Sequence, residues 1–127
     1  MADTTAANLS SIAPLTALTE EERMFQAAGR EFAEKEIRPH VEHMDREGVF
    51  HRELMDNFFA QGFMGLEVPE AYGGSGGTFF MAILAIEEFS RVDASAGVVI
   101  DVQNTLVNNA SSAGAAKRRS RSSSPAW

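Results

Sequence analysis

Apolar side chains recur at helical spacing in four stretches of this chain. In the first stretch, Phe25 to Ile37, they stand three to five residues apart, and in the second, Leu54 to Phe59, they fill four of six positions. The third, from Phe79 to about Val92, is apolar around most of its circumference, and the fourth runs from Ala96 to Asn109. Because residues three or four apart share one face of an α-helix, the pattern predicts an all-α fold of about four helices.

Capping residues mark the ends of these helices. Thr19 is followed three positions later by Glu22, an arrangement that forms a capping box, and Thr78 stands before the third helix. Pro39 is expected to end or kink the first helix, because its ring clashes with the preceding turn and it has no amide hydrogen. Gly62 is expected to cap the end of the second helix.

The fourth stretch carries two patterns that bear on function. Its apolar face is formed by Val98, Val99, Val102 and Leu106. The β-branched run 98–100 makes a strand the local alternative to a helix. Beside the apolar face lies a polar run, which comprises Asp101, Gln103, Asn104 and Thr105. Buried polar groups need partners, so this run predicts either a binding site or hydrogen bonds from helix to helix.

The glycine-rich stretch Gly73 to Gly77 joins the second and third helices of the pattern. A phosphate-binding P-loop requires Gly-Lys-Ser/Thr after its glycines, and a dinucleotide-binding turn requires a preceding strand. The pattern provides neither of these features. The stretch is therefore interpreted as a flexible hinge between helices.

Composition describes a single acidic domain. The 127 residues contain no cysteine, which excludes a disulfide framework and cysteine-based metal sites. The residues before Ser111 hold seven Lys and Arg against 18 Asp and Glu, so phosphate is repelled and nucleic acid is not an expected partner. No apolar run approaches the roughly 20 residues needed to cross a bilayer, so no membrane span is expected.

The first thirteen residues hold no lysine or arginine and one acid, Asp3. Secretory signals begin with positive charge and mitochondrial presequences are rich in arginine, so this opening is typical of neither. A cytoplasmic location is the expectation, with the mitochondrial matrix as the alternative.

Side chains with catalytic or metal-binding chemistry form no recognisable site in the sequence. His40, His43 and His51 lack the tight ligand grouping of a zinc centre, so no metal site is expected. Glu87 and Glu88 lie on the polar strip of the third helix and are expected to be solvated or paired with a cation. The sequence contains no identifiable Ser-His-Asp or Cys-His arrangement, and no catalytic residue is assigned.

Five ordered segments resemble the beginning of the acyl-CoA dehydrogenases. These are Ile12–Thr16; Leu18–Glu22; Phe32–Ala33 with Ile37 and Pro39; Gly62–Glu70, which runs into Tyr72–Gly76; and Glu87–Ser95. The resemblance covers about residues 12–110. Met44–Asp45 together with Gln103–Leu106 look most like the short- and branched-chain members of the family.

The resemblance implies a large flavoenzyme, of which this chain holds the N-terminal helical domain. In the family that domain is followed by a β-domain and a C-terminal four-helix domain, and the homotetrameric enzyme oxidises the Cα–Cβ bond of an acyl-CoA thioester. A glutamate removes the α-proton, FAD takes the β-hydride, and an electron-transfer flavoprotein receives the electrons. The glutamate and most FAD contacts belong to the later domains, so this chain alone is expected to be inactive and to retain no FAD.

By resemblance, the last helix forms a wall of the acyl pocket. The candidate substrate-binding residues are Val98, Val99, Val102 and Leu106. Small β-branched side chains there fit a short or branched acyl chain, although the same stripe serves equally well as core. The resemblance assigns no cofactor-binding residue.

The chain changes character after Ala110. Residues 111–127 hold four Lys and Arg, no acid and no amphipathic period. The family continues here with a stretch resembling Gly-Thr-Glu-Glu-Gln-Lys-x-x-Tyr-Leu-Pro, and the tail codons read one base earlier permit Gly-Ser-Glu-Glu-Gln-Ile-Glu-Phe-Leu-Leu-Pro. Our hypothesis is a one-base frame shift near codon 110. The alternative is a genuine Arg/Ser-rich tail that is disordered and open to phosphorylation.

Three segments are therefore predicted: a flexible N-terminal segment 1–17, a family-like helical domain 18–110 and a basic tail 111–127. The favoured function is that of an N-terminal fragment of an FAD-dependent acyl-CoA dehydrogenase for short or branched substrates. The alternatives are a non-catalytic helical interaction module with a disordered tail, and a split enzyme completed by a separate chain. Because the third helix would lose surfaces that normally cover it, the fragment is expected to be marginally stable and prone to aggregate.

Overall fold

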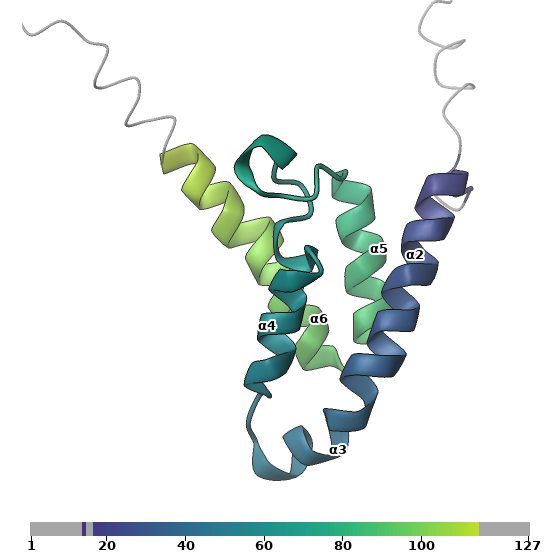
Figure 1. Ribbon diagram of the computed structural model, residues 1–127, viewed down its shortest axis with the longest axis vertical. Coiled ribbons are helices and arrows are strands. Elements are labelled where there is room, and N and C mark those ends of the chain that lie inside the picture. Colours follow the sequence, from purple (N-terminus) through teal and green to yellow (C-terminus); the bar gives the residue numbers. More distant parts are fainter. Residues whose placement is uncertain (1–13, 15–16, 115–127) are drawn as a thin grey trace, which may run out of the picture.

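The computed structural model describes residue 14 and residues 17–114, and every regular element in that part of the chain is helical (Figure 1). In chain order the elements are α2 (Glu20–Phe32), the π-helical turn η1 (Ala33–Ile37), α3 (Arg38–Glu47), α4 (Arg52–Ala60), the 3-10 turns η2 (Phe63–Gly65) and η3 (Glu70–Tyr72), α5 (Phe79–Ser90), α6 (Ala94–Asp101) and the π-helical segment η4 (Val102–Asn108). The η1 turn joins α2 to α3, and η4 extends α6, so the described residues form four longer helical segments. The predicted all-α class is confirmed, and the strand alternative at residues 98–100 is excluded because these residues belong to α6.

The first helix begins as predicted, and of the two outcomes expected near Pro39, an end or a kink, the structure shows a kink. The Glu22 amide donates to the Thr19 hydroxyl at 3.1 Å, and the Thr19 amide donates to the Glu22 carboxylate at 2.8 Å, which completes the capping box. Pro39 lies in the first turn of α3, where a missing amide hydrogen is tolerated. The η1 turn, which is wider than an α-helical turn, ends two residues before Pro39. The chain changes direction at this turn and continues as α3 (Figure 1). Helix α3 then ends at Gly48, whose φ is 65°.

A cluster of phenylalanine rings forms the centre of the core. Phe89 of α5 lies 5.5 Å from Phe32, 5.2 Å from Phe58 and 4.8 Å from Phe63, measured between ring centroids. Phe58 and Phe89 are fully buried. The rings come from α2, α4, η2 and α5, so one aromatic cluster fixes four elements against one another.

Helix α5 is covered on two sides. The Thr78 hydroxyl accepts from the Met81 amide at 3.2 Å and begins the helix, as predicted. Helix α2 packs against one side of α5 and α6 against another. Phe79 and Ile83 nevertheless remain exposed. The predicted cover is therefore present on two sides of α5, and the apolar face that carries Phe79 and Ile83 stays open to solvent.

The last helix is longer than predicted. The Asp93 carboxylate accepts from the Ala96 amide at 2.8 Å and caps α6, and residues 109–114 stay helical beyond η4. The helix therefore passes the expected end at Asn109 and includes the first four residues of the predicted tail. The rest of that tail, and nearly all of the predicted flexible segment 1–17, lie outside the described residues.

Candidate functional site

An apolar groove of about 350 Å³ lies between α4, the η2 turn and the last helix. Its lining residues are Met55, Phe59, Met64, Val98, Val99, Val102 and Gln103. Three of the four predicted acyl-wall residues therefore share one groove, whereas Leu106 does not line it. Gln103 is the single polar side chain in the lining, and no titratable group lines the groove, so its surface suits a hydrocarbon chain.

Exposure separates the two interpretations of the valine stripe. Val98 is 58% exposed and Leu106 is 63% exposed, and Val102 is exposed as well. Val99 is half-buried and packs against the core cluster. A core function therefore applies to Val99 alone, and the other three residues form an outward-facing apolar surface.

The polar run beside the stripe connects the last helix to the η2 turn. Asn104 is 2% exposed, and its carboxamide oxygen accepts from the Leu66 amide at 2.9 Å. Its nitrogen donates to the carbonyls of Phe63 and Ile100, both at 2.8 Å. All of the side chain's strong interactions are thus made inside the protein. The sequence predicted either a binding site or hydrogen bonds between helices for this run. Asn104 forms hydrogen bonds, and its partners outside its own helix lie in the connector around η2.

A second amide strengthens the same attachment. The Asn108 nitrogen donates to the Met64 carbonyl at 2.9 Å, and Gln103 donates to the Asn108 oxygen at 2.9 Å. Thr105 bonds within its own helix, to the carbonyl of Asp101 at 2.8 Å. Hydrogen bonds to Met64 and to its neighbours Phe63 and Leu66 therefore attach this part of the groove wall to the helix that carries Val102.

The glycine-rich stretch is an ordered buttress rather than a hinge, which corrects the sequence interpretation. Five consecutive amides, from Gly73 to Gly77, donate to carbonyls of the segment 65–70 at 2.7–3.2 Å. The Ser75 hydroxyl donates to the Gly62 carbonyl at 2.9 Å. A Cβ placed on Gly74 would stand 1.9 Å from the Val68 carbonyl oxygen, so only glycine fits there. Because its amides already have partners, the stretch cannot cradle a phosphate.

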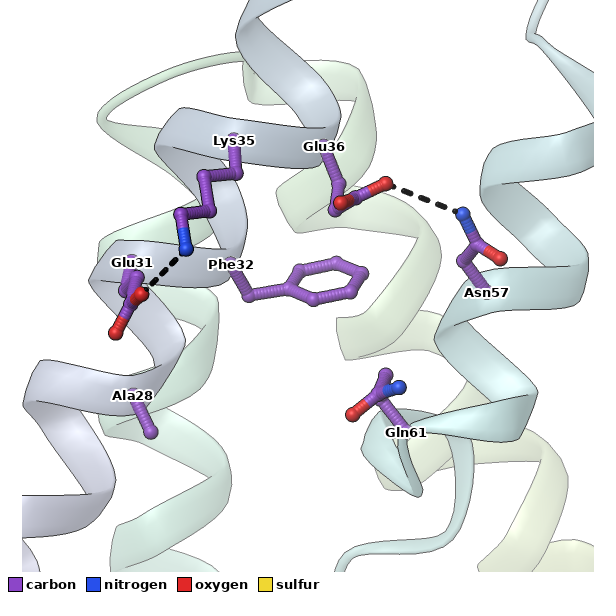
Figure 2. A pocket seen from close by; sticks show the side chains of 7 residues that line it. All are labelled: Ala28, Glu31, Phe32, Lys35, Glu36, Asn57 and Gln61. Carbon is purple, nitrogen blue, oxygen red and sulfur yellow. Dashed lines mark hydrogen bonds and ion pairs between the residues drawn. The ribbon is translucent and has the colours of Figure 1, made fainter.

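A separate polar cleft of about 330 Å³ lies between α2, η1 and α4 (Figure 2). Its lining residues are Ala28, Glu31, Phe32, Lys35, Glu36, Asn57 and Gln61. Figure 2 shows the Phe32 ring extending between the helices, beneath the Glu36 carboxylate, which accepts from Asn57 at 3.4 Å. Lys35 is paired with Glu31 at 2.7 Å, so the one cation of the cleft is already neutralised. The remaining negative charge disfavours the phosphates of coenzyme A.

Glu88 is a buried carboxylate held by arginine. It is 2% exposed, and both of its oxygens accept from Arg30, at 2.8 and 2.9 Å, while Arg91 donates at 3.3 Å. The hydrogen bonds from Arg30 hold the pKa of Glu88 below its ordinary value, against the opposing effect of burial. The predicted cation pairing is confirmed for Glu88, whereas its neighbour Glu87 is exposed.

The three histidines come together in space, which their spacing along the chain did not predict. The His40 and His51 ring centroids are 4.4 Å apart, and those of His43 and His51 are 5.8 Å apart. Among residues 17–114, no group of three or more His, Cys, Asp or Glu side chains has the geometry to hold a metal ion. In the same part of the chain, no helix has the length and apolarity to cross a membrane.

Comparison with known proteins gives a consistent result. The family model described as "Acyl-CoA dehydrogenase, N-terminal domain" matches residues 19–122 and so extends past residue 110, the predicted end of the family-like segment. The short/branched chain specific acyl-CoA dehydrogenase of Bos taurus mitochondria is 42% identical over 97 residues, which are 76% of this chain and 22% of that protein. This chain therefore spans less than a quarter of that relative.

Two solved structures share the fold. Butyryl-CoA dehydrogenase from Megasphaera elsdenii superposes with a TM-score of 0.62 at 32% identity, over 68% of this chain and 23% of that one. A chain from a structure titled as the electron transferring flavoprotein of Acidaminococcus fermentans gives a TM-score of 0.64 at 40% identity, over the same shares of the two chains.

Proposed function

The chain belongs to the acyl-CoA dehydrogenase family, and we propose that it contributes the N-terminal domain of an enzyme for short or branched acyl-CoA thioesters. The observation that carries the proposal is the groove between α4 and the last helix, in which Val98, Val99 and Val102 meet two methionines and Phe59. The identity to a short/branched-chain relative supports the substrate class.

The task of these residues is to hold the acyl chain and to exclude water. The apolar lining gives the hydrocarbon an environment that it prefers to solvent, at roughly 25 cal/mol for each Å² removed from water. β-Branched valines hold few rotamers, so they present a fixed wall. No described residue of the groove can act as a general base, and we propose that the proton and hydride transfers depend on groups outside this chain.

The described residues do not fit FAD by themselves. The flavin ring edge and the diphosphate need several hydrogen-bond donors or cations, and the groove offers one polar side chain, Gln103. The glycine-rich stretch has no free amide for a phosphate. We therefore propose that this chain alone neither retains FAD nor turns over substrate.

The test of the acyl wall is a chimera in which residues 18–110 replace the matching segment of the bovine relative. The chimera is expected to bind FAD and to oxidise a short branched acyl-CoA. Val102→Phe should then lower kcat/KM for that substrate by about tenfold or more, because a ring fills part of the groove. Val49→Phe, at an exposed position outside the groove, is the matched control. Equal effects of the two substitutions, or dye-linked turnover by the isolated chain with added FAD, would overturn the proposal.

We propose residues 18–110 as the family-like domain, with 1–17 and 111–127 as flanking segments. Electron-transfer flavoprotein is the proposed electron acceptor of the complete enzyme, and a homotetramer is its proposed assembly. Nucleic acid is not a proposed partner, given the acidic composition of residues 1–110. The proposed location is cytoplasmic, with the mitochondrial matrix as the alternative, since the name of the bovine relative describes it as mitochondrial.

A further inference from the structure

The polar cleft between α2, η1 and α4 holds a carboxylate that lacks a cation. Glu36 of η1 is half-buried, and among residues 17–114 no lysine or arginine forms an ion pair with it. The adjacent Lys35 is paired with Glu31 instead, at 2.7 Å. The hydrogen bond that Glu36 accepts from the neutral Asn57 amide is long, at 3.4 Å, compared with the usual length of about 2.9–3.0 Å. Because a cationic partner stabilises a partly buried carboxylate, Glu36 favours the binding of a positively charged group.

Two carboxamides beside Glu36 provide further hydrogen-bond acceptors. The nitrogen of Asn57 faces the carboxylate, and within the described part of the chain no group donates to the Asn57 oxygen. Gln61 lines the same cleft, and its side chain forms no hydrogen bond with any other described residue. In Figure 2 the Phe32 ring lies between the Glu36 carboxylate and the Gln61 carboxamide. A ligand in the cleft therefore meets an aromatic ring with oxygen acceptors beside it.

The Phe32 ring gives the cleft a rigid aromatic surface. The ring is stacked on Phe89 of the core, with the two planes 13° apart and the centroids 5.5 Å apart. Its centroid lies 5.1 Å from that of Phe63, so the aromatic cluster fixes its orientation. Phe32 is nevertheless only half-buried, and it lines the cleft. Aromatic rings attract cations through their negative faces and pack against hydrocarbon stems.

Size and chemistry select one class of cation. The cleft measures about 330 Å³, and no group of described side chains has the geometry to hold a metal ion. An alkylammonium is a compact charge that water hydrates strongly, whereas a guanidinium is planar, is hydrated more weakly and stacks on aromatic rings. Two guanidinium N–H groups can also donate to the two oxygens of one carboxylate, which makes such pairs strong. A carboxylate, two amide oxygens and an aromatic ring in one cleft therefore suit a guanidinium.

We propose that this cleft binds a guanidinium group. Glu36 is its anionic partner, the oxygens of Asn57 and Gln61 are further acceptors, and Phe32 is the surface on which it stacks. The group belongs either to a small free alkylguanidine or to an arginine of a polypeptide, since the recognised chemistry is the same. The cleft shares no lining residue with the apolar groove, so the inference is independent of the proposed catalytic function.

Nuclear magnetic resonance of the ¹⁵N-labelled full chain tests the proposal, with n-propylguanidinium as the probe at constant ionic strength. Saturable shifts are expected for the amides of residues 31–36 and 57–61, with a Kd of about 1–10 mM, as for a small ligand with few contacts. Nuclear Overhauser effects should join the probe to the ring protons of Phe32. Propylurea has nearly the same shape without the charge and should bind at least about tenfold more weakly. Propylammonium keeps the charge without the planar donors and should also bind more weakly.

Glu36→Gln keeps the size of the side chain, removes its charge and should weaken propylguanidinium binding by at least about tenfold. Glu42→Gln makes the same change at an exposed position on α3, outside the cleft, and should leave binding unchanged. The full chain has arginines of its own in residues 115–127, so the titration is repeated with Arg118→Ser, Arg119→Ser and Arg121→Ser combined. This variant removes competition from those side chains for the cleft.

A tripeptide distinguishes the two sources of the guanidinium. N-acetyl-Gly-Arg-Gly-amide should bind at least about tenfold more tightly than propylguanidinium if the cleft recognises an arginine of a polypeptide, and with similar affinity if it recognises a free alkylguanidine. The absence of saturable shifts in both the full chain and its triple arginine variant would overturn the proposal. Equal binding of propylguanidinium and propylurea or propylammonium, or equal binding by the wild type and Glu36→Gln, would overturn it as well.

Discussion

Arg30 of α2 donates to Glu88 of α5 through two guanidinium nitrogens, at 2.8 and 2.9 Å, and the two residues, 58 positions apart in sequence, thereby fix the register of their helices. Gly29 stands next to this pair, and a Cβ there would lie 4.0 Å from the Glu88 Cβ, in ordinary contact. Loss of the carboxylate charge should therefore be felt as loss of helix packing.

Glu88→Gln is expected to lower the free energy of unfolding by about 1–2 kcal/mol, because the buried carboxylate that accepts from Arg30 is replaced by a neutral amide, a weaker acceptor. Glu87→Gln makes the same chemical change one residue away, at an exposed position, and should change stability by less than about 0.5 kcal/mol. Urea unfolding at neutral pH, followed by circular dichroism, measures both. Indistinguishable variants would show that the pair does not stabilise the fold.

Acid should remove the advantage of Glu88 over glutamine. The pKa of Glu88 is lowered in the folded protein, first by its hydrogen bonds from Arg30, so the folded state favours the ionised form. The resulting stabilisation is complete above the unfolded-state value of about 4.3 and is lost as pH falls through the lowered folded pKa. Unfolding curves at pH 7, 5, 4 and 3 should show the wild-type protein and Glu88→Gln converging below about pH 4. A difference that is constant with pH would contradict the assigned cause.

Asn104→Ala should destabilise the protein by about 2–3 kcal/mol, since it leaves the Leu66 amide and the Phe63 carbonyl buried without their partner. Asn109→Ala is the control, because Asn109 is exposed and bonds within its own helix to Thr105. Thermal unfolding compares the two. If Asn104→Ala melts with the wild type, the hydrogen bonds to the connector contribute nothing.

Gly74→Ala is expected to cost about 2–3 kcal/mol, because the new methyl group would overlap the Val68 carbonyl and force the backbone apart. Gly114→Ala offers a matched control, since nothing lies within 4 Å of a Cβ at that helical position. The control should be neutral or slightly stabilising, as alanine favours helix. Chemical denaturation of both variants decides, and a neutral Gly74→Ala would mean that the stretch moves freely.

The helices of this fold follow directly from the sequence, because their apolar period and their caps at Thr19 and Thr78 act locally. The difference between Glu87 and Glu88 is not contained in the local pattern. Ile83 and Leu84, four residues before them, are both apolar, and only the packing of α5 makes Leu84 buried and Ile83 exposed. The choice of Arg30 as partner depends on how α2 and α5 pack, and no local pattern contains that information.

The candidate site was predictable only in part. A stripe at 98, 99, 102 and 106 indicates a shared face, but the groove beside it needs Met55 and Met64, which other elements bring into place. The glycine-rich stretch was wrongly predicted to be a flexible hinge, because its composition is that of a linker. Its order comes from hydrogen bonds to carbonyls of the segment 65–70. The histidine cluster likewise depends on how α3 packs against the start of α4, which the spacing of the residues does not determine.

The ordered glycine-rich stretch from Gly73 to Gly77 has a practical consequence for limited proteolysis and for the insertion of tags. A protease must draw its substrate into an extended strand, and here it would first have to break the bonds made by five successive amides. The most linker-like sequence in the domain should therefore resist digestion. For the same reason, a tag or a fluorescent label inserted between Gly73 and Gly77 would separate α5 from the connector that orients it, so such insertions belong elsewhere.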